Sequence, residues 1–128
     1  MANVLVLSAG RRVGLVSIFE HALSSLGLKG ASVIAIDSAP DLAAACVTAS
    51  MSAASLPADH PQYVDHLLQF CLKNSVKLVI PTNDKELVVL AKHRSRFLDS
   101  GVTISISTLD LVRICRNKYL SMEALFEC

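Results

Sequence analysis

The stretch of sequence that decides the fold is Val4-Leu-Val-Leu-Ser-Ala-Gly-Arg-Arg-Val-Gly14. It opens with four consecutive apolar residues, which predict a strand buried on both faces because neither face is left polar. After the Ser-Ala-Gly turn, apolar residues recur at helical spacing from Leu15 to Leu26, and Gly27 ends this helix. A buried strand that leads directly into a helix predicts the first half of a βαβ unit.

The same alternation of strand and helix continues along the chain. Three more apolar runs predict strands at Val33–Ile36, Leu78–Ile80 and Val102–Ile106, and we expect a further short strand near Cys46–Thr48. Strands that alternate with helices predict right-handed crossovers between parallel neighbours. We therefore expect an α/β fold, namely a three-layer, Rossmann-like domain with a mainly parallel sheet of four to five strands.

Helix start signals accompany this alternation. They predict four further helices, which begin at Asp59, Asn83, Thr108 and Asn117. Asn83 and Glu86 have the spacing of a capping box, in which each side chain would bond a backbone N–H of the other residue. The last segment carries three apolar side chains on one side, at Met122, Leu125 and Phe126.

Composition excludes several classes of protein. The chain has 128 residues, of which 52% are hydrophobic and 18% are charged, so disorder and coiled coil are excluded. Every apolar run falls short of the ~20 residues that a membrane span needs. The net charge of +1 gives no general attraction to nucleic acid or anionic membrane. The apolar excess fits a buried parallel sheet, or a face that docks on a partner.

Four cysteines are scattered without a C-x-x-C spacing, which favours reduced thiols in a cytoplasmic protein. The N-terminal residues carry no basic segment and no cleavage site of an export signal. Neither these cysteines nor the four histidines show the spacing of a catalytic or metal-binding arrangement. We therefore predict no catalytic residue and no metal ligand in this chain.

Candidate site residues lie where the buried strands end, because ligands of such sheets bind beyond the carboxyl ends of the strands. Gly10 permits a tight turn, and Arg11 and Arg12 place positive charge in the first turn of a helix, whose N–H groups attract anions. Their charge opposes the helix dipole at a cost of ~0.3–1 kcal/mol each, which an anionic partner would reverse. The alternative is that both arginines are solvated or paired with a neighbouring carboxylate.

Two further segments end at the same edge of the predicted sheet. Asp37 follows the second strand and resembles the ribose-binding acid of dinucleotide-binding proteins, but the glycine pattern of that motif is poorly matched. The third strand leads into a segment with four candidate ligands, Thr82, Asn83, Asp84 and Glu86. The two acids could accept hydrogen bonds from a substrate amine or hydroxyl, or could simply complement the dipole of the helix that they open.

The order of these motifs resembles a known family. Ser8-Ala-Gly-Arg-Arg-Val-Gly14 is followed by Val33-Ile-Ala-Ile-Asp37, by Leu78-Val-Ile-Pro-Thr-Asn-Asp-Lys-Glu-Leu87 and by Asn117-Lys118-Tyr119. This order resembles the N-terminal, or pre-ATP-grasp, domain of ATP-grasp ligases of the carbamoyl-phosphate-synthase-like type. The resemblance covers nearly the whole chain, although each motif alone has low specificity.

The resemblance implies a carboxylate–amine or carboxylate–nitrogen ligase that activates an acid as an acyl phosphate with ATP and Mg²⁺. It implies a pre-ATP-grasp domain over residues 1–116, and the start of a truncated or missing ATP-grasp domain over 117–128. Lys118 resembles the lysine that lies near the nucleotide phosphates, although Asn117 departs from the family's usual aspartate. We expect a fragment or a split-gene subunit that is inactive alone, and that binds neither ATP nor Mg²⁺ tightly without its ATP-grasp partner.

Two other hypotheses remain open. The first is a stand-alone Rossmann-like module that binds a nucleotide or another anionic small molecule through Gly10, Arg11 and Arg12. The second is a structural docking domain whose apolar excess forms an interface with a partner or, in a homodimer, with a second copy.

Overall fold

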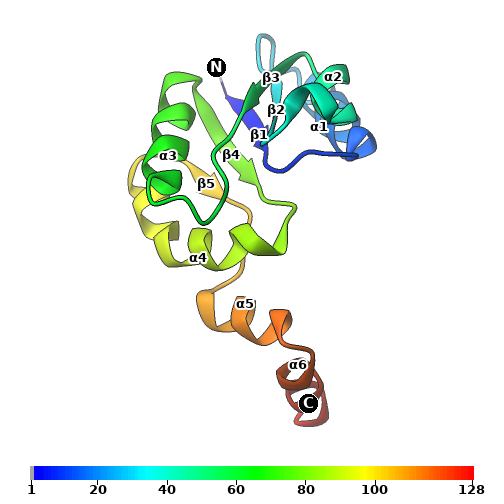
Figure 1. Ribbon diagram of the computed structural model, residues 1–128. Coiled ribbons are helices and arrows are strands. Elements are labelled where there is room, and N and C mark those ends of the chain that lie inside the picture. The colour runs from blue at the N-terminus through cyan, green and yellow to red at the C-terminus, as the bar shows by residue number, and fades with distance from the viewer. Residues whose placement is uncertain (1) are drawn as a thin grey trace.

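Five strands form one all-parallel sheet in a computed structural model, which describes residues 2–128 (Figure 1). The strands are β1 (Asn3–Val6), β2 (Val33–Asp37), β3 (Met51–Ala54), β4 (Val76–Ile80) and β5 (Thr103–Ile104). Their order in the sheet is β3-β2-β1-β4-β5, and every neighbouring pair is parallel. The predicted α/β fold with a parallel sheet of four to five strands is confirmed.

Helices cover both faces of the sheet (Figure 1). One face carries α1 (Val13–Ser25) and α2 (Ala44–Thr48), the latter preceded by the 3₁₀ turn η1 (Pro40–Leu42). The other face carries α3 (Tyr63–Lys73) and α4 (Asp84–Asp99). After β5 the chain continues into α5 (Leu109–Arg116) and α6 (Lys118–Phe126), which extend away from the three layers in Figure 1.

The apolar run of β1 is explained by the two cores on either side of the sheet. Leu5 and Leu7 belong to the core on the α3–α4 face, whereas Val4 and Val6 belong to the core on the α1–α2 face. Successive side chains of a strand point to opposite faces, so a central strand covered on both sides needs an apolar residue at each position. This burial fixes β1 at the centre of the sheet.

The short strand expected near Cys46–Thr48 is wrong. These residues form the last part of helix α2, and the strand β3 begins three residues later at Met51. Cys46 is buried in the α1–α2 core, and its thiol donates to the carbonyl oxygen of Ala35 at 3.5 Å. A run of small residues has no clear period of its own, so packing against the sheet decides its conformation.

Other boundaries also differ from the expected ones. The helix expected from Asp59 begins at Tyr63, because the preceding residues form a turn in which the N–H of Tyr63 donates to the carbonyl oxygen of His60. The strand expected over Val102–Ile106 is reduced to β5, after which only the N–H of Ser105 still bonds β4. β5 lies at the edge of the sheet, where only one neighbour can extend the ladder.

The two C-terminal helices begin at the expected caps. Thr108 Oγ1 accepts from the N–H of Leu111, and Asn117 Oδ1 accepts from the N–H groups of Tyr119 and Leu120. The expected apolar side of α6 is exposed, with Met122, Leu125 and Phe126 at 57%, 76% and 85% of full exposure. None of the helices in residues 2–128 has the length and apolar character that crossing a bilayer requires.

Candidate functional site at the carboxyl edge of the sheet

The order of the strands locates a crevice at the carboxyl ends of β1 and β4. The chain builds outward from β1 to β2 and β3 on one side, and then to β4 and β5 on the other. The connections that leave β1 and β4 therefore turn to opposite faces of the sheet, which opens a crevice between them. The loop from Ser8 to Arg12 and the loop from Pro81 to Asn83 border this crevice.

The loop after β1 presents the N-terminus of α1 without a cap. Ser8 and Gly10 both have φ +46°, a conformation that glycine adopts readily and serine rarely. Arg12 occupies the N-cap position without a side-chain hydrogen bond to the helix, and the first turn contains no acidic residue. The first N–H groups of α1 therefore have no carboxylate of their own helix beside them, which favours an anion from outside.

Arg12 and Thr82 join the two loops. Nη2 of Arg12 donates to the carbonyl oxygen of Thr82 at 3.1 Å. The hydroxyl of Thr82 lies 2.9 Å from the carbonyl oxygen of Leu7 and 3.0 Å from that of Ser8. Thr82 therefore holds the loops together, whereas the exposed Arg11 makes no salt bridge or hydrogen bond within residues 2–128.

Asp37 supports the turn after β1. Its Oδ2 accepts from the N–H of Gly10 and its Oδ1 from the N–H of Ala39, both at 3.1 Å. The hydroxyl of Ser38 lies 3.5 Å from the same Oδ1. Because both carboxylate oxygens are engaged, a ribose hydroxyl at this position would have to share them with the backbone.

The start of α4 differs from the predicted capping box. Oδ1 of Asn83 caps the helix by accepting from the N–H of Lys85 at 3.1 Å, and Asp84 is exposed in the first turn. The carboxylate of Glu86 does not complete the box with a well-formed hydrogen bond to the N–H of Asn83. Glu86 instead turns inward, toward the loop that follows β1.

Glu86 is the buried acid of the crevice. Only 5% of it is exposed, and its Oε1 accepts from the Ser8 hydroxyl at 2.5 Å. Burial raises the pKa of Glu86, because a charged carboxylate loses its hydration there. The Ser8 hydroxyl, the nearby N–H groups of Asn83 and Thr82, and the Tyr63 hydroxyl act in the opposite direction and lower this pKa.

The second oxygen of Glu86 has no partner. Among residues 2–128, the buried side-chain atoms without a hydrogen bond are Glu86 Oε2 and Tyr63 Oη. Burial raises the pKa of Tyr63, and the adjacent Glu86 carboxylate raises it further, so the Tyr63 hydroxyl remains protonated. The two groups influence each other's pKa, but their geometry falls short of a hydrogen bond between them. The site thus contains an unused acceptor beside an unused donor.

The sequence candidates divide into two groups in the structure. The loops after β1 and β4, together with Asp37, bring eight of the nine candidates to the crevice. They are Gly10, Arg11, Arg12, Asp37, Thr82, Asn83, Glu86 and the exposed Asp84. Lys118 is instead exposed at the first position of α6. Asn117 serves as the cap of α6, a role in which asparagine replaces aspartate readily.

Sequence reasoning missed two polar residues of the site. Ser8 stands in the turn predicted after the first strand, and nothing in its residue type predicts the left-handed backbone that aims its hydroxyl at Glu86. Tyr63 is the first residue of α3 and belongs to the core on the α3–α4 face, where its hydroxyl lies by the Glu86 carboxylate. A polar aromatic residue at a core position of the helical pattern was the available signal, since a buried tyrosine hydroxyl usually needs a partner.

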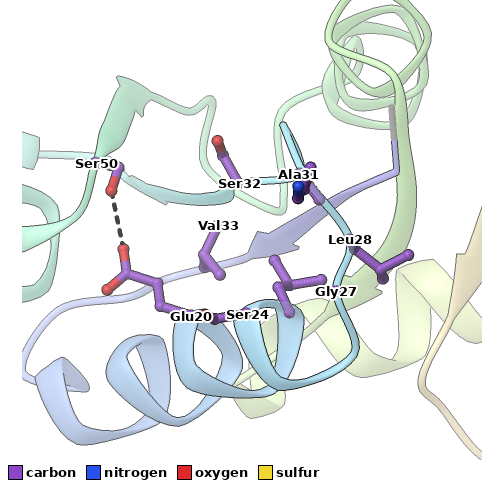
Figure 2. A pocket seen from close by; sticks show the side chains of 10 residues that line it. Glu20, Ser24, Gly27, Leu28, Ala31, Ser32, Val33 and Ser50 are labelled. Carbon is purple, nitrogen blue, oxygen red and sulfur yellow. Dashed lines mark hydrogen bonds between the residues drawn. The ribbon is translucent and has the colours of Figure 1, made fainter.

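A separate cavity of about 530 Å³ lies at the opposite end of the strands (Figure 2). The C-terminal part of α1 and the starts of β2 and β3 form its walls. Its one carboxylate, Glu20, accepts from the Ser50 hydroxyl at 3.1 Å, as the dashed line in Figure 2 marks. None of the candidate site residues lines this cavity.

Comparisons with known proteins identify the domain. A family model described as the PylC-like N-terminal domain matches residues 4–105. The biotin carboxylase domain of a single-chain bacterial carboxylase is similar with a TM-score of 0.62 and 20% identity, over 99% of this chain and 29% of that one. Glycinamide-RNase-transformylase T from Mycobacterium tuberculosis has a TM-score of 0.59 and 19% identity, over 88% and 30% of the two chains. A comparison with curated proteins gave no match.

The likeness to solved structures establishes the fold alone at these identities, and the chain spans about 30% of the length of those structures. The family model covers most of the chain, from the second residue of β1 through the crevice loops to β5. The chain therefore belongs to the PylC-like N-terminal domain family and has the fold of the N-terminal, pre-ATP-grasp domain that its sequence predicts.

Proposed function

We propose that this chain is the substrate-side N-terminal domain of an ATP-dependent carboxylate–amine or carboxylate–nitrogen ligase. The ligase would be of the carbamoyl-phosphate-synthase-like type and would activate an acid as an acyl phosphate. The family assignment and the fold of the solved relatives support this proposal. We propose a cytoplasmic location, in keeping with the four free thiols.

The observation that carries the proposal is the composition of the crevice. On one side are an uncapped helix N-terminus and the exposed Arg11, which favour a carboxylate or another anion. On the other side is the Glu86 carboxylate, which bonds the Ser8 hydroxyl and lines a small cavity together with it; a carboxylate there favours a hydrogen-bond donor such as an amine. A crevice with these two preferences suits a ligase whose substrates are an acid and an amine.

We propose that this chain alone binds neither Mg²⁺ nor ATP tightly. Within residues 2–128, no three His, Cys, Asp or Glu side chains come together as a metal site would require. Asp37 is engaged by the backbone of its own loops. We therefore assign no catalytic step to this chain and propose that a separate ATP-grasp domain or subunit binds ATP and Mg²⁺, with Lys118 beside the phosphates.

The exposed apolar side chains of α6 support such a partner. A helix that is apolar on most sides is normally buried. The exposed fractions are nevertheless 69%, 76% and 85% for Tyr119, Leu125 and Phe126. Within residues 2–128, the element against which α6 packs extensively is α5. We propose that an ATP-grasp domain covers this helix. A homodimer through the same helix is the other way to cover it.

Turnover and ligand binding test the proposal together. The purified chain is incubated with Mg-ATP, a panel of carboxylates and a panel of amines, and phosphate release is measured. We expect no release above that of a protein-free control, and no tight binding of Mg-ATP by calorimetry. Robust turnover would contradict the proposal that the nucleotide half is supplied elsewhere.

A binding measurement distinguishes the alternative of a stand-alone anion-binding module. The uncapped N-terminus of α1 favours this alternative too. Tight nucleotide binding that weakens with salt and in Arg11→Ala would support it and remove the ligase proposal. The matched control is Arg94→Ala, which removes an exposed cation on α4, outside the crevice. Arg11 is preferred to Arg12 as the tested residue because Arg12 also bonds Thr82.

A further inference from the structure

The strand β3 forms an open edge of the sheet (Figure 1). Within residues 2–128 its one neighbour in the sheet is β2, and three of its four residues are exposed. The N–H of Ser55, directly after β3, donates to the carbonyl oxygen of Asp37 in β2. Because the peptide groups of a strand point alternately to its two sides, those of Ser52 and Ala54 face away from the sheet.

These outward peptide groups are unpaired in the described part of the chain. The hydrogen bonds that residues 2–128 form outside their helices and ladders do not involve the backbone of Ser52 or Ala54. A strand edge with free N–H and C=O groups is a template for one more strand. The opposite edge of the sheet is a poorer template, because β5 is only two residues long. The sheet can therefore be extended at β3.

β3 also lacks the side chains that usually protect an exposed edge. Charged residues, lysine above all, and proline are the common ones. Residues 42–58 contain no Asp, Glu, Lys, Arg or His, and Pro57 lies beyond the end of β3. Exposed apolar side chains flank the strand instead, namely Leu42 of η1, Val47 of α2 and Met51 of β3 itself. An uncharged edge with apolar flanks favours pairing over solvation.

The occupant that fits this edge is a second copy of β3. A foreign peptide that adds to a sheet edge is selected by pockets for its alternate side chains. The cavities beside β3 instead stop at Ser50 and at Ser55, on either side of the strand. The edge thus offers backbone hydrogen bonds and small, uncharged side chains, and β3 itself has the same properties. Self-pairing brings no like charges together, because the two copies of Glu20, which bonds Ser50, would lie at opposite ends of an antiparallel pair.

We propose that β3 is the interface of a homodimer, in which two copies of this strand pair antiparallel about a twofold axis and join the two sheets into one. The outward peptide groups fix the register: Ser52 of each copy pairs with Ala54 of the other and exchanges both N–H···O bonds with it. Ala53 then lies opposite its own copy at the axis, where side chains approach most closely and a methyl group fits. The proposal is independent of the proposed function, because β3 contributes no residue to the crevice loops.

Sedimentation velocity of the full chain measures the dimer, and amide hydrogen exchange locates it. We expect a monomer–dimer equilibrium between about 1 µM and 1 mM, because a four-residue strand covers less than the ~1,600 Å² of a standard interface. As the protein concentration rises, exchange should slow at Ser52 and Ala54, whose N–H groups face outward. It should stay constant at Ser55, whose N–H already bonds β2.

Two double variants that share one substitution test the register. Ser52→Lys with Ala54→Lys places like charges directly opposite each other and should weaken the dimer about tenfold or more. Ser52→Lys with Ala54→Glu places opposite charges there and should keep the dimer within about threefold of the wild type. Phe126→Ser on the exposed α6 is the control for another apolar surface and should leave the dimer unchanged. Circular dichroism of each variant establishes that it is folded.

The outcomes are distinct. A chain that stays monomeric at every concentration, with constant exchange at Ser52 and Ala54, would overturn the proposal. A dimer that is lost in Phe126→Ser and unaffected by both double variants would move the interface to α6 and overturn it as well. Equal weakening by the two double variants would overturn the register of Ser52 with Ala54. All of these variants leave the crevice residues unchanged, so the proposed function stands or falls separately.

Discussion

Substitution of Asp37 tests whether this residue stabilises the turn after β1 or binds the ribose of a nucleotide. Replacing Asp37 by alanine removes the acceptor for the N–H groups of Gly10 and Ala39, each 3.1 Å from a carboxylate oxygen. The Gly10 bond is partly buried, and a hydrogen bond to a charged group contributes roughly 1.5–3 kcal/mol. The Ala39 N–H is exposed, so water replaces its partner and the loss is about 0.5 kcal/mol. The free energy of unfolding should fall by about 2–3.5 kcal/mol.

Asp37→Asn refines this prediction. The carboxamide has the shape of the carboxylate and one acceptor oxygen, so it can keep one of the two N–H partners. We expect it to lose about half as much stability as Asp37→Ala, which is about 1–1.8 kcal/mol. Asp41→Ala is the matched control, because Asp41 is exposed and its side chain accepts no hydrogen bond in the described part of the chain; it should change stability by less than ~0.5 kcal/mol.

Urea unfolding followed by circular dichroism measures all three variants. A change in the midpoint at constant slope would report stability alone, since the slope follows the surface exposed on unfolding. If Asp37→Ala cost no more than Asp41→Ala, the two backbone hydrogen bonds would carry no weight and the structural role of Asp37 would be refuted. An accompanying loss of nucleotide binding would then restore the ribose-binding role.

Three further predictions concern burial. Burial raises the pKa of Glu86, so the wild type loses stability as its carboxylate ionises above pH ~4.5. The free energy of unfolding of Glu86→Gln should therefore rise relative to the wild type above this pH, by at most ~1.4 kcal/mol per pH unit. A difference that does not change with pH would contradict this prediction. Phe97→Ala, at a fully buried position, should lose about 3–5 kcal/mol in urea, against under ~1 kcal/mol for the exposed neighbour Leu98→Ala. Burial raises the pKa of Cys71 to about 12, so this thiol should react with a thiol reagent only after unfolding, unlike exposed Cys115; fast labelling of all four thiols would contradict it.

The fold was predictable from sequence because burial on two faces leaves a plain signal. The continuous apolar runs of β1 and β2 indicate strands buried on both faces. The position of the crevice could then be predicted, because ligands of open α/β sheets bind beyond the carboxyl ends of the strands. The strand predicted around Cys46 was wrong, since alanines and serines have no clear period and this segment forms a helix that packs on the sheet. Strand ends were also missed where an edge position limits pairing, as at β5.

The candidate site was predictable in place but not in detail. Arg12 and Asp37 lie where expected, yet each has a backbone partner that spacing along the chain does not reveal. The inward turn of Glu86 depends on the left-handed backbone of Ser8 and on space left beside Tyr63. These are contacts between elements that are far apart in sequence, so no local pattern encodes them.

The central claim is that this domain supplies the substrate side of the reaction and another domain supplies the nucleotide side. The most direct test is an amide NMR map of the chain, titrated with butyrate and separately with Mg-ATP. We predict that butyrate shifts a saturable set of amides confined to residues 8–14 and 82–86, whereas Mg-ATP produces no saturable change. Saturable binding of Mg-ATP at these loops, without a response to butyrate, would contradict the account.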